Sequence, residues 1–538
     1  MIADEIQQSD TGFHSIRKPT IMRIKLTFHL EANAIAATLK HPLLKKHAVM
    51  AASETALREV YFDSPDGVIQ RANANLSVQS NHLVQVQSLQ IGDEQNSQNF
   101  SGGLQQWRSW QFKLPDHQPD LGLLKSLTKN KTGYQKLLRE IITLKALHEV
   151  FQTRFNRYAI MLQLPEDTDV ACSLEHGQIS SGDQSRQFCI LDFELLSGSM
   201  IQLIQFTLAL MKTTPLHVGH LCKIEQGYAL HDRLPVSAVT ATELSLTPQL
   251  PVEEAVRRII HSCMTQIQSN QAGIREPWNP ECLHQMRVGF RRLRSTFWLL
   301  KKIQPLPDDF EEEMEWLDTQ LGQARDWDVF HASTLPQLIN LTDSNKTNKT
   351  TLQDLHRLAA DRMRLAHREV CAALVTPRYA RIVLGLLRWQ CELVEQLRRD
   401  PNQSDLIEFS DQALKKSQQR LLRRSKQISD LEPKSLHQLR VTVKKIRYMA
   451  DFFKALYPPG KIQHYIDTIA RLQDCLGQSN DRIVAGRLIQ TILADHPELD
   501  AGFINALFAA HFDTNKTHIP RLLKALMQIS LKELLSGH

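Results

Sequence analysis

The eight cysteines of this 538-residue chain are too scattered to form a recognisable framework. No two of them stand in a CxxC pair, and none has histidine neighbours at the spacing of a zinc site. The pattern therefore argues against a disulfide-rich scaffold and against a zinc-binding module. We interpret the cysteines as reduced thiols in the protein core.

Long hydrophobic runs are also missing. No stretch of about 18 uninterrupted apolar residues occurs, and residues 1–20, MIADEIQQSDTGFHSIRKPT, lack the apolar segment of a signal peptide. Hydrophobic residues make up 42% of the chain and charged residues 23%, which is typical of a globular protein. We expect a cytoplasmic protein that makes no membrane contact, and the length predicts two or more domains.

Positive charge is unevenly distributed along the chain. Residues 1–250 carry 23 Lys and Arg against 24 Asp and Glu, whereas residues 251–538 carry 41 against 34. The surplus therefore lies entirely in the second half, and an acidic partner is expected to bind there.

The two halves also differ in their hydrophobic pattern. Residues 20–215 contain short alternating runs such as MRIKLTFHL, HLVQVQSLQIG and FCILDFELL, which predict an antiparallel sheet with interspersed helices. Residues 251–538 have a helical period almost throughout. We therefore predict an α+β protein with a flexible N-terminus (1–19), a β domain (20–215), a linker region (216–250) and an all-helical domain (251–538).

The helical half contains an internal repeat. LHQMRVGFRRLRSTFWLL (283–300) recurs as LHQLRVTVKKIRYMADFF (436–453), and LDTQLGQARDWDV (317–329) recurs as LQDCLGQSNDRIV (472–484). Two segments that recur in the same order at nearly the same offset predict two related half-bundles, over about 251–400 and 405–538.

Each copy of the first motif predicts an amphipathic helix with a cationic stripe. On a helix that advances about 100° per residue, the polar positions of each copy share one sector and the apolar positions oppose it. The two stripes consist of His284, Arg287, Arg291 and Arg294, and of His437, Arg440, Lys444 and Arg447.

Two interpretations of these stripes remain open. The like charges are either solvated or bridged to acidic neighbours, or they form a paired cationic surface for phosphate, which suits arginine forks. Arg378, Arg381 and Arg388 would extend such a surface. We predict that Asp326, Asp328 and Asp481 hold the basic side chains in place rather than act in catalysis. Each stripe has one histidine and no adjacent carboxylate, so no metal site is expected.

The repeated motifs resemble those of the CHAD domain, the conserved-histidine α-helical domain. HxxRVxxRRLR, HxxRVxxKKIRY, LGxARDxDV and LQDxLGxxND carry the resemblance, which covers about 251–538. It implies two pseudo-symmetric helical bundles and a basic surface that binds inorganic polyphosphate, with association to polyphosphate granules and their proteins. The implied binding residues are His284, Arg287, Arg291, Arg292, Arg294, His437, Arg440, Lys444, Lys445 and Arg447. Arg292 lies about 80° from His284, on the side away from Arg294.

The N-terminal half resembles a degenerate CYTH domain, the triphosphate tunnel fold. YFDSPDGVIQRANANLSVQ and LEHGQI followed by LDFELLSG carry this resemblance, which implies an antiparallel β tunnel. The family's ExExK motif reads Ile21, Arg23, Lys25 here, so both metal-binding glutamates are missing. Asp192, Glu194 and Arg157 remain. Because triphosphatase chemistry of this kind needs a metal ion on clustered carboxylates, we expect an inactive domain.

The sequence therefore favours a non-enzymatic protein that binds polyphosphate or another phosphate-rich polyanion, with no cofactor, metal or catalytic residue. A metal-dependent triphosphatase or polyphosphatase that uses Asp192 and Glu194 is the alternative. Nucleic-acid binding through the same stripes is a further one, although Trp298 is the main aromatic residue near them.

Overall fold

The protein is described by a computed structural model that forms two compact units, Met1–Pro235 and Val236–His538. The residues that the structure describes are 23–81, 83–92, 104–129, 134–144, 146–218, 222–232, 236–275, 278–340, 346–399, 405–425, 433–511, 521 and 523–524. Ile21 and the expected flexible terminus 1–19 lie outside them.

The boundary between the units falls inside the expected linker region 216–250. Helix α7 (Lys223–Asp232) packs on strands of the first unit. Beyond the boundary, the Asn270 side chain accepts a hydrogen bond from the Val239 amide (2.9 Å) and donates one to the Val239 carbonyl (2.8 Å). Most of the described part of 216–250 thus belongs to one unit or the other, because its backbone and apolar side chains find partners there.

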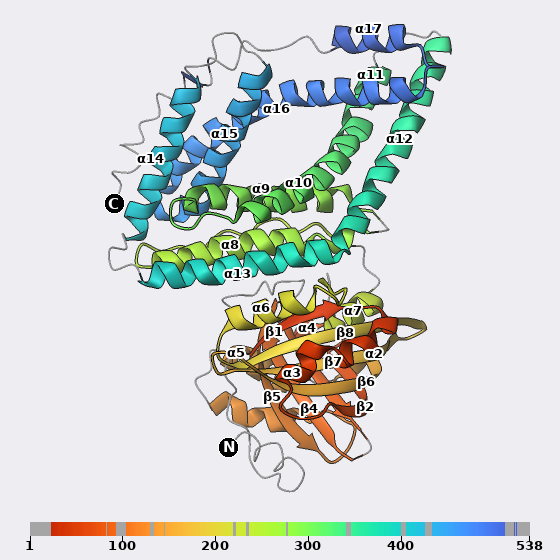
Figure 1. Ribbon diagram of the computed structural model, residues 1–538, viewed down its shortest axis with the longest axis vertical. Coiled ribbons are helices and arrows are strands. Elements are labelled where there is room, and N and C mark those ends of the chain that lie inside the picture. The colour runs from red at the N-terminus through yellow and green to blue at the C-terminus, as the bar shows by residue number, and fades with distance from the viewer. Residues whose placement is uncertain are drawn as a thin grey trace. The chain divides into compact units, whose positions relative to one another are not determined.

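The first unit is a nine-stranded antiparallel sheet in the order β5-β4-β3-β2-β6-β7-β8-β1-β9 (Figure 1). Strand β1 pairs with β8 on one side and with β5 on the other, so eight strands close into a barrel. This confirms the predicted β tunnel. The strands are β1 (Arg23–His29), β2 (Ser53–Asp63), β3 (Ala74–Ser80), β4 (Gln85–Gly92), β5 (Leu104–Leu114), β6 (His148–Leu164), β7 (Thr168–Ser181), β8 (Gln184–Ser197) and β9 (His217–Val218).

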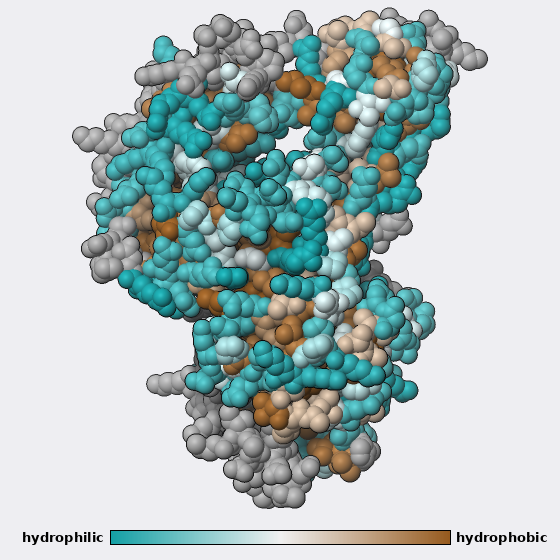
Figure 2. All heavy atoms as spheres, in the orientation of Figure 1, coloured by the Kyte–Doolittle hydropathy of each residue, from teal (hydrophilic) through white to brown (hydrophobic). Residues whose placement is uncertain are grey.

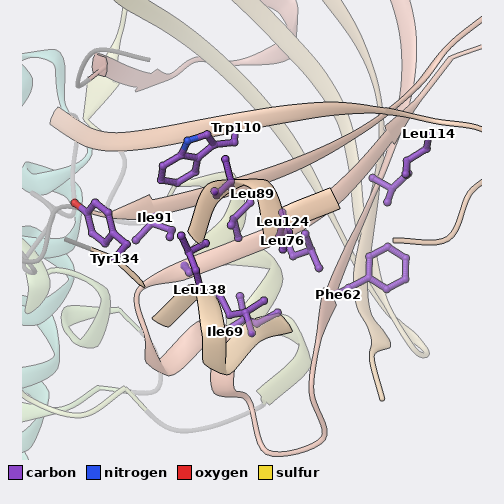
Figure 3. Close-up of a cluster of buried hydrophobic side chains, with 14 of the residues drawn as sticks. Phe62, Ile69, Leu76, Leu89, Ile91, Trp110, Leu114, Leu124, Tyr134 and Leu138 are labelled. Atoms are coloured by element: carbon purple, nitrogen blue, oxygen red, sulfur yellow. The ribbon is translucent and has the colours of Figure 1, made fainter. Parts of the chain in front are cut away.

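The outer face of β2–β5 is apolar and covered. Val78, Leu89 and Trp110 are buried there, and η4 (Leu121–Lys129) and α5 (Gln135–Ile142) pack over them (Figure 3). Because side chains alternate along a strand, the intervening residues face into the barrel, and these are mostly glutamines and serines. The barrel therefore has a dry exterior on this side and a polar interior. Shorter helices of the unit are α2 (Ile35–Leu39), α3 (Pro42–His47), α4 (Val68–Arg71) and α6 (Met200–Leu210).

The second unit is helical, as predicted. Its helices are α8 (Val252–Ser269), α9 (Pro280–Leu300), α10 (Asp308–Val329), α11 (Leu335–Asn340), α12 (Lys346–Leu374), α13 (Pro377–Arg399), α14 (Leu406–Ser425), α15 (Pro433–Phe453), α16 (Pro459–Asp495) and α17 (Ala501–His511).

The sequence repeat corresponds to two helix pairs, α9 with α10 and α15 with α16. Helix α9 begins where the Asn279 side chain accepts from the Glu281 amide and Pro280 occupies the first turn. Its Met286, Phe290 and Leu293 are buried, as is Val443 at the equivalent face of α15. Helices α9 and α15 also contact each other. The apolar faces therefore fix the orientation of both cationic stripes.

Among the described residues, no single helix is long and apolar enough to cross a membrane. One pair bent by 58°, Lys349–Leu374 with Pro377–Arg399, meets the length and composition of a span.

Candidate functional site

The two stripes meet in a pseudo-symmetric arrangement. Arg287 on α9 lies 3.8 Å from Asp326 on α10, and the repeat-related Arg440 on α15 lies 3.8 Å from Asp481 on α16. Asp326 also receives a contact of 3.1 Å from Arg487 of α16, which joins the two halves. At 3.8 Å the first two pairs are too long for strong hydrogen bonds, so the carboxylates hold these arginines only loosely.

The guanidinium groups of the stripes are only partly satisfied. The Nε atoms of Arg287, Arg291, Arg440 and Arg447 are buried and have no hydrogen-bond partner among the described residues. A buried charged donor without a partner is costly. These arginines therefore keep N–H donors that a bound anion would satisfy.

Charge repulsion shows that the stripes form one cluster. Burial and, after it, the nearby cations Arg291, Arg440 and Arg287 together lower the pKa of Lys444 to about 6. Two of these three cations lie on the other copy of the repeat. We call Arg287, Arg291, Arg440 and Lys444 the central basic cluster.

A second group of cations adjoins the first. Burial lowers the pKa of Lys445 to about 8, with contributions from Arg420, Arg294 and Arg424. Arg420 and Arg424 lie on α14, which carries no copy of the repeated motifs, so the sequence analysis missed them. We call Lys445, Arg294, Arg420 and Arg424 the α14-side cluster. Arg294 also forms an ion pair with Asp318.

The helical unit has an opening between its helices. Figure 2 shows an opening through the helical unit with hydrophilic residues along most of its border. In Figure 1 the same place lies between α10, α15 and α16, which together with α9 carry the coupled charges. Helices of both repeats therefore border one opening.

Two cations near the central basic cluster, Arg325 and Arg487, were not predicted from the sequence. Only Arg325 could have been, because it lies within a repeated motif. Arg325 directly precedes Asp326 in the second motif, and it contributes, after burial, to a lowered pKa of half-buried His284. Arg487 lies beyond the end of the repeated segment. Burial also raises the pKa of Asp326 although Arg287 and Arg487 lie close to it. The carboxylate is thus desolvated as well as surrounded by cations.

Arg292 does not belong to the cationic surface. It is buried, and its guanidinium donates to Gln266 Oε1 (2.8 Å) and Ser262 Oγ (3.2 Å) and lies 5.3 Å from the centre of the Phe452 ring. Its position, about 80° from His284, turns it into the interface between helices instead of along the stripe. The expectation that Arg292 lies on the cationic surface is therefore wrong.

Asp328 has a different partner from the one expected. It lies 2.5 Å from His367 Nε2, in a buried pair on which Trp278 stacks. Two residues along a helix turn a side chain by about 200°. Asp328 therefore points away from the arginine that Asp326 holds.

The remaining predicted residues lie at the edges of the site or outside it. His437 is exposed, and Arg447 lies 3.8 Å from Asp451 on its own helix. On α13, Arg378 donates to Glu313 (2.6 Å), Arg388 donates to Glu392 (2.7 Å) and Arg381 is exposed. Helix α13 packs against α8, α10 and α12. The engaged arginines of α13 thus behave as surface ion pairs.

The barrel holds a separate cavity of about 490 Å³ that is partly open to solvent. Its charged lining residues are paired: Lys25 with Asp192 (2.9 Å), Arg157 with Glu175 (2.7 Å), and Lys223 with both Glu59 (3.1 Å) and Glu175 (3.0 Å). Glu194 also lines the cavity. Burial opposes the charge on Glu175, but Lys223 and Arg157 hold its pKa well below the usual value. Lys223 lies in the expected linker region, which is why the sequence analysis missed it.

These charges do not form a metal centre in the observed conformation. Within the described ranges, no group of three or more His, Cys, Asp or Glu side chains is arranged to hold a metal ion. Asp192 accepts from Lys25 and from Thr27 Oγ1 (2.6 Å), so both of its oxygens are engaged. Neither the cations nor this carboxylate is free to act on a phosphate.

We therefore expect the full chain to release no phosphate from tripolyphosphate in the presence of Mg²⁺ or Mn²⁺, beyond the rate in buffer. A colorimetric phosphate assay measures this. The expectation fails if phosphate is released and the release disappears in Asp192→Asn or Glu194→Gln.

Comparison with known proteins identifies the helical unit. The sequence model of the CHAD domain matches residues 258–490. The crystal structure of a CHAD domain from the plant Ricinus communis is 32% identical, with 54% of this chain and 97% of that chain covered and a TM-score of 0.48.

Two further structures have lower scores. PptA from Streptomyces chartreusis is 15% identical, with 52% of this chain and 99% of that chain covered and a TM-score of 0.36. HpAC1 from Hippeastrum, described as an adenylyl cyclase candidate with a dominant triphosphatase activity, is 12% identical, with 38% and 93% covered and a TM-score of 0.26. Such low scores carry no functional conclusion. On the match over residues 258–490 and the identity to the plant domain, the chain belongs to the CHAD domain family.

Proposed function

We propose that the helical unit binds inorganic polyphosphate through the central basic cluster. The observation that carries the proposal is the set of buried, unpartnered Nε donors on Arg287, Arg291 and Arg440, among the described residues, beside a lysine whose charge is suppressed. Arginine forks bind phosphate oxygens in two-point contacts, and an anion offsets the repulsion that depresses the pKa of Lys444. No further chemistry is required of the site.

A chain of phosphates fits better than a single phosphate ion. The central cluster draws on two helices related by the repeat, and the α14-side cluster continues the positive charge through Lys445. A linear polyanion would contact both clusters at once and gain from each. In the cell, the same contacts would hold the protein on polyphosphate granules and beside their other proteins, which is part of this proposal.

RNA is a less suitable ligand for this surface. Single-stranded nucleic acids gain affinity from bases stacked on aromatic side chains. Trp298, the aromatic residue that the sequence pointed to, has Lys416 Nζ at 5.3 Å and the Arg420 guanidinium at 5.6 Å from its ring centre. Cations of α14 thus occupy the space that a base would need.

The test is a competition between the two polyanions. The full chain is titrated with fluorescently labelled long-chain polyphosphate, and unlabelled polyphosphate or RNA is added at equal phosphate concentration. The proposal expects saturable binding that weakens as salt rises, with polyphosphate the stronger competitor. Equal or stronger competition by RNA, or no saturable binding, would refute it.

The protein should also take up a proton when it binds polyphosphate. In the free protein the pKa of Lys444 is about 6, so the amine is largely neutral at neutral pH. A bound anion favours the ammonium form and raises this pKa, which means that affinity falls as the pH rises above about 6, by at most about tenfold per pH unit. Calorimetric titrations in two buffers of different ionisation enthalpy measure the uptake.

The matched control is Lys444→Arg, which stays charged. It should reduce the proton uptake by nearly one proton while it retains binding. Identical uptake by the two proteins would show that other groups, such as the phosphate chain ends, account for the pH dependence.

A further inference from the structure

We propose that the barrel of the first unit binds an uncharged, hydroxyl-rich small molecule of about disaccharide size. This site is separate from the polyphosphate surface, and the inference does not depend on it. An eight-stranded barrel is just wide enough either to fill its interior with side chains or to hold one small ligand. Here the cavity has a volume of about 490 Å³, which is within the usual range of ligand sites, roughly 300–1,000 Å³.

The cavity exists because its walls carry small and medium polar side chains. Ser88 and Ser109 face inward, whereas Leu89 and Trp110, the next residues along each strand, are buried in the outer core. Apolar residues at these inward positions would have filled the barrel and stabilised it by about 25 cal/mol per Å² buried. The polar interior therefore stabilises the fold less than a filled, apolar interior would. Ligand binding is a function that would account for this loss of stability.

Polar groups line this cavity. Trp107 Nε1 is buried without a hydrogen-bond partner among the described residues, and the half-buried Gln79 and Gln90 and the exposed Gln111 add amide side chains to the lining. An amide side chain offers a donor and an acceptor, and the indole nitrogen offers a donor. A hydroxyl group is the uncharged group that donates and accepts at one atom, so a polyol satisfies such a mixed wall in many orientations.

The charge of the cavity disfavours phosphates. Its lining holds three cations, Lys25, Arg157 and Lys223, against the four carboxylates of Glu59, Glu175, Asp192 and Glu194. Each cation is engaged by a carboxylate at 2.7–3.1 Å. A phosphorylated ligand would have to displace these carboxylates from a lining that already carries more negative than positive groups, whereas a neutral ligand leaves every pair intact.

The probes are trehalose, maltose and sucrose, together with the phosphomonoester of trehalose and tripolyphosphate. Saturation-transfer NMR and calorimetry on the full chain detect binding at millimolar concentration. We expect saturable binding of at least one of the three neutral sugars. The phosphomonoester should bind more weakly than trehalose, and tripolyphosphate should not compete with the sugar.

Gln90→Leu removes an inward-facing amide at nearly constant volume. It should weaken sugar binding roughly threefold to tenfold, while Gln187→Leu, the same change at an exposed position of β8 outside the cavity, should leave it unchanged. Thermal melts of both variants report whether the barrel stays folded, and Gln79→Leu is the second variant if Gln90→Leu does not fold.

Three results would overturn the inference. They are the absence of binding by all three sugars, binding of a phosphorylated probe at least as tight as that of the neutral sugars, and sugar binding that neither inward-facing substitution weakens.

Discussion

Replacing Arg287 and Arg440 together by glutamine should lower the affinity for polyphosphate by about a hundredfold or more. Each arginine is half-buried, lies on one copy of the repeat and has an unpartnered Nε among the described residues. A hydrogen bond to a charged group contributes about 1.5–3 kcal/mol, so the loss of two such residues removes roughly 3–6 kcal/mol. Fluorescence titration of the double variant against long-chain polyphosphate measures the change.

The control variant carries Arg357→Gln and Arg399→Gln. Both of these side chains are largely exposed, 66% and 81%, and each pairs with a carboxylate on its own helix. The control has the same net charge as the test variant, so a general electrostatic attraction would weaken binding equally in the two. Equal loss in both variants would contradict a specific site, and so would an unchanged affinity of the Arg287 and Arg440 variant. The slope of log affinity against log salt should become shallower only in the test variant.

Replacing Lys223 by methionine should destabilise the first unit by about 3–5 kcal/mol. Lys223 is partly buried between Glu59 and Glu175, and although desolvation opposes its charge, these carboxylates hold its pKa above the usual value. Among the described residues, its removal leaves Glu59 without an ion-pair partner and Glu175 with Arg157 alone. The melting temperature of this unit should fall by roughly 10 °C, as measured by circular dichroism.

The pH dependence of the destabilisation shows whether the Lys223→Met variant loses charge pairing or packing. In the native protein, the pKa values of Glu59 and Glu175 are lowered, so these groups stabilise the fold above their unfolded pKa and lose that contribution as the pH falls. In the variant their pKa values rise, so the penalty is present at neutral pH and diminishes on acidification. Lys125→Met, at an exposed position, is the control. A loss of the same size at neutral and mildly acidic pH would indicate lost packing instead of lost charge.

The repeat made much of the helical site predictable. A pattern that recurs at one offset places equivalent residues in equivalent surroundings, and the two contacts of 3.8 Å, Arg287 with Asp326 and Arg440 with Asp481, are an example. Arg420 and Arg424 escaped notice because α14 has no repeated motif to mark it. Arg292 was assigned to the site by the family resemblance, although its angle of about 80° from His284 already set it apart from the stripe.

The barrel was predictable as an antiparallel tunnel, but its interior charges were not. Alternation along a strand indicates which residues face inward, yet it does not indicate which strands meet across the cavity. Lys25 and Asp192 lie 167 positions apart in the sequence, and only the pairing of β1 with β8 brings them together. Lys223 comes from a short helix after the barrel, where no periodicity marks it as a counter-ion.

The closure of the barrel through β1 also bears on how the protein folds during synthesis. Strand β1 is translated before the other described strands, but it pairs with residues 104–107 of β5 and 190–195 of β8. Contacts so distant in sequence are slow to form, because a long loop must close before they are made. One edge of the nascent β1 therefore stays unpaired until β8 has been translated, and this interval is when the first unit most needs protection from aggregation.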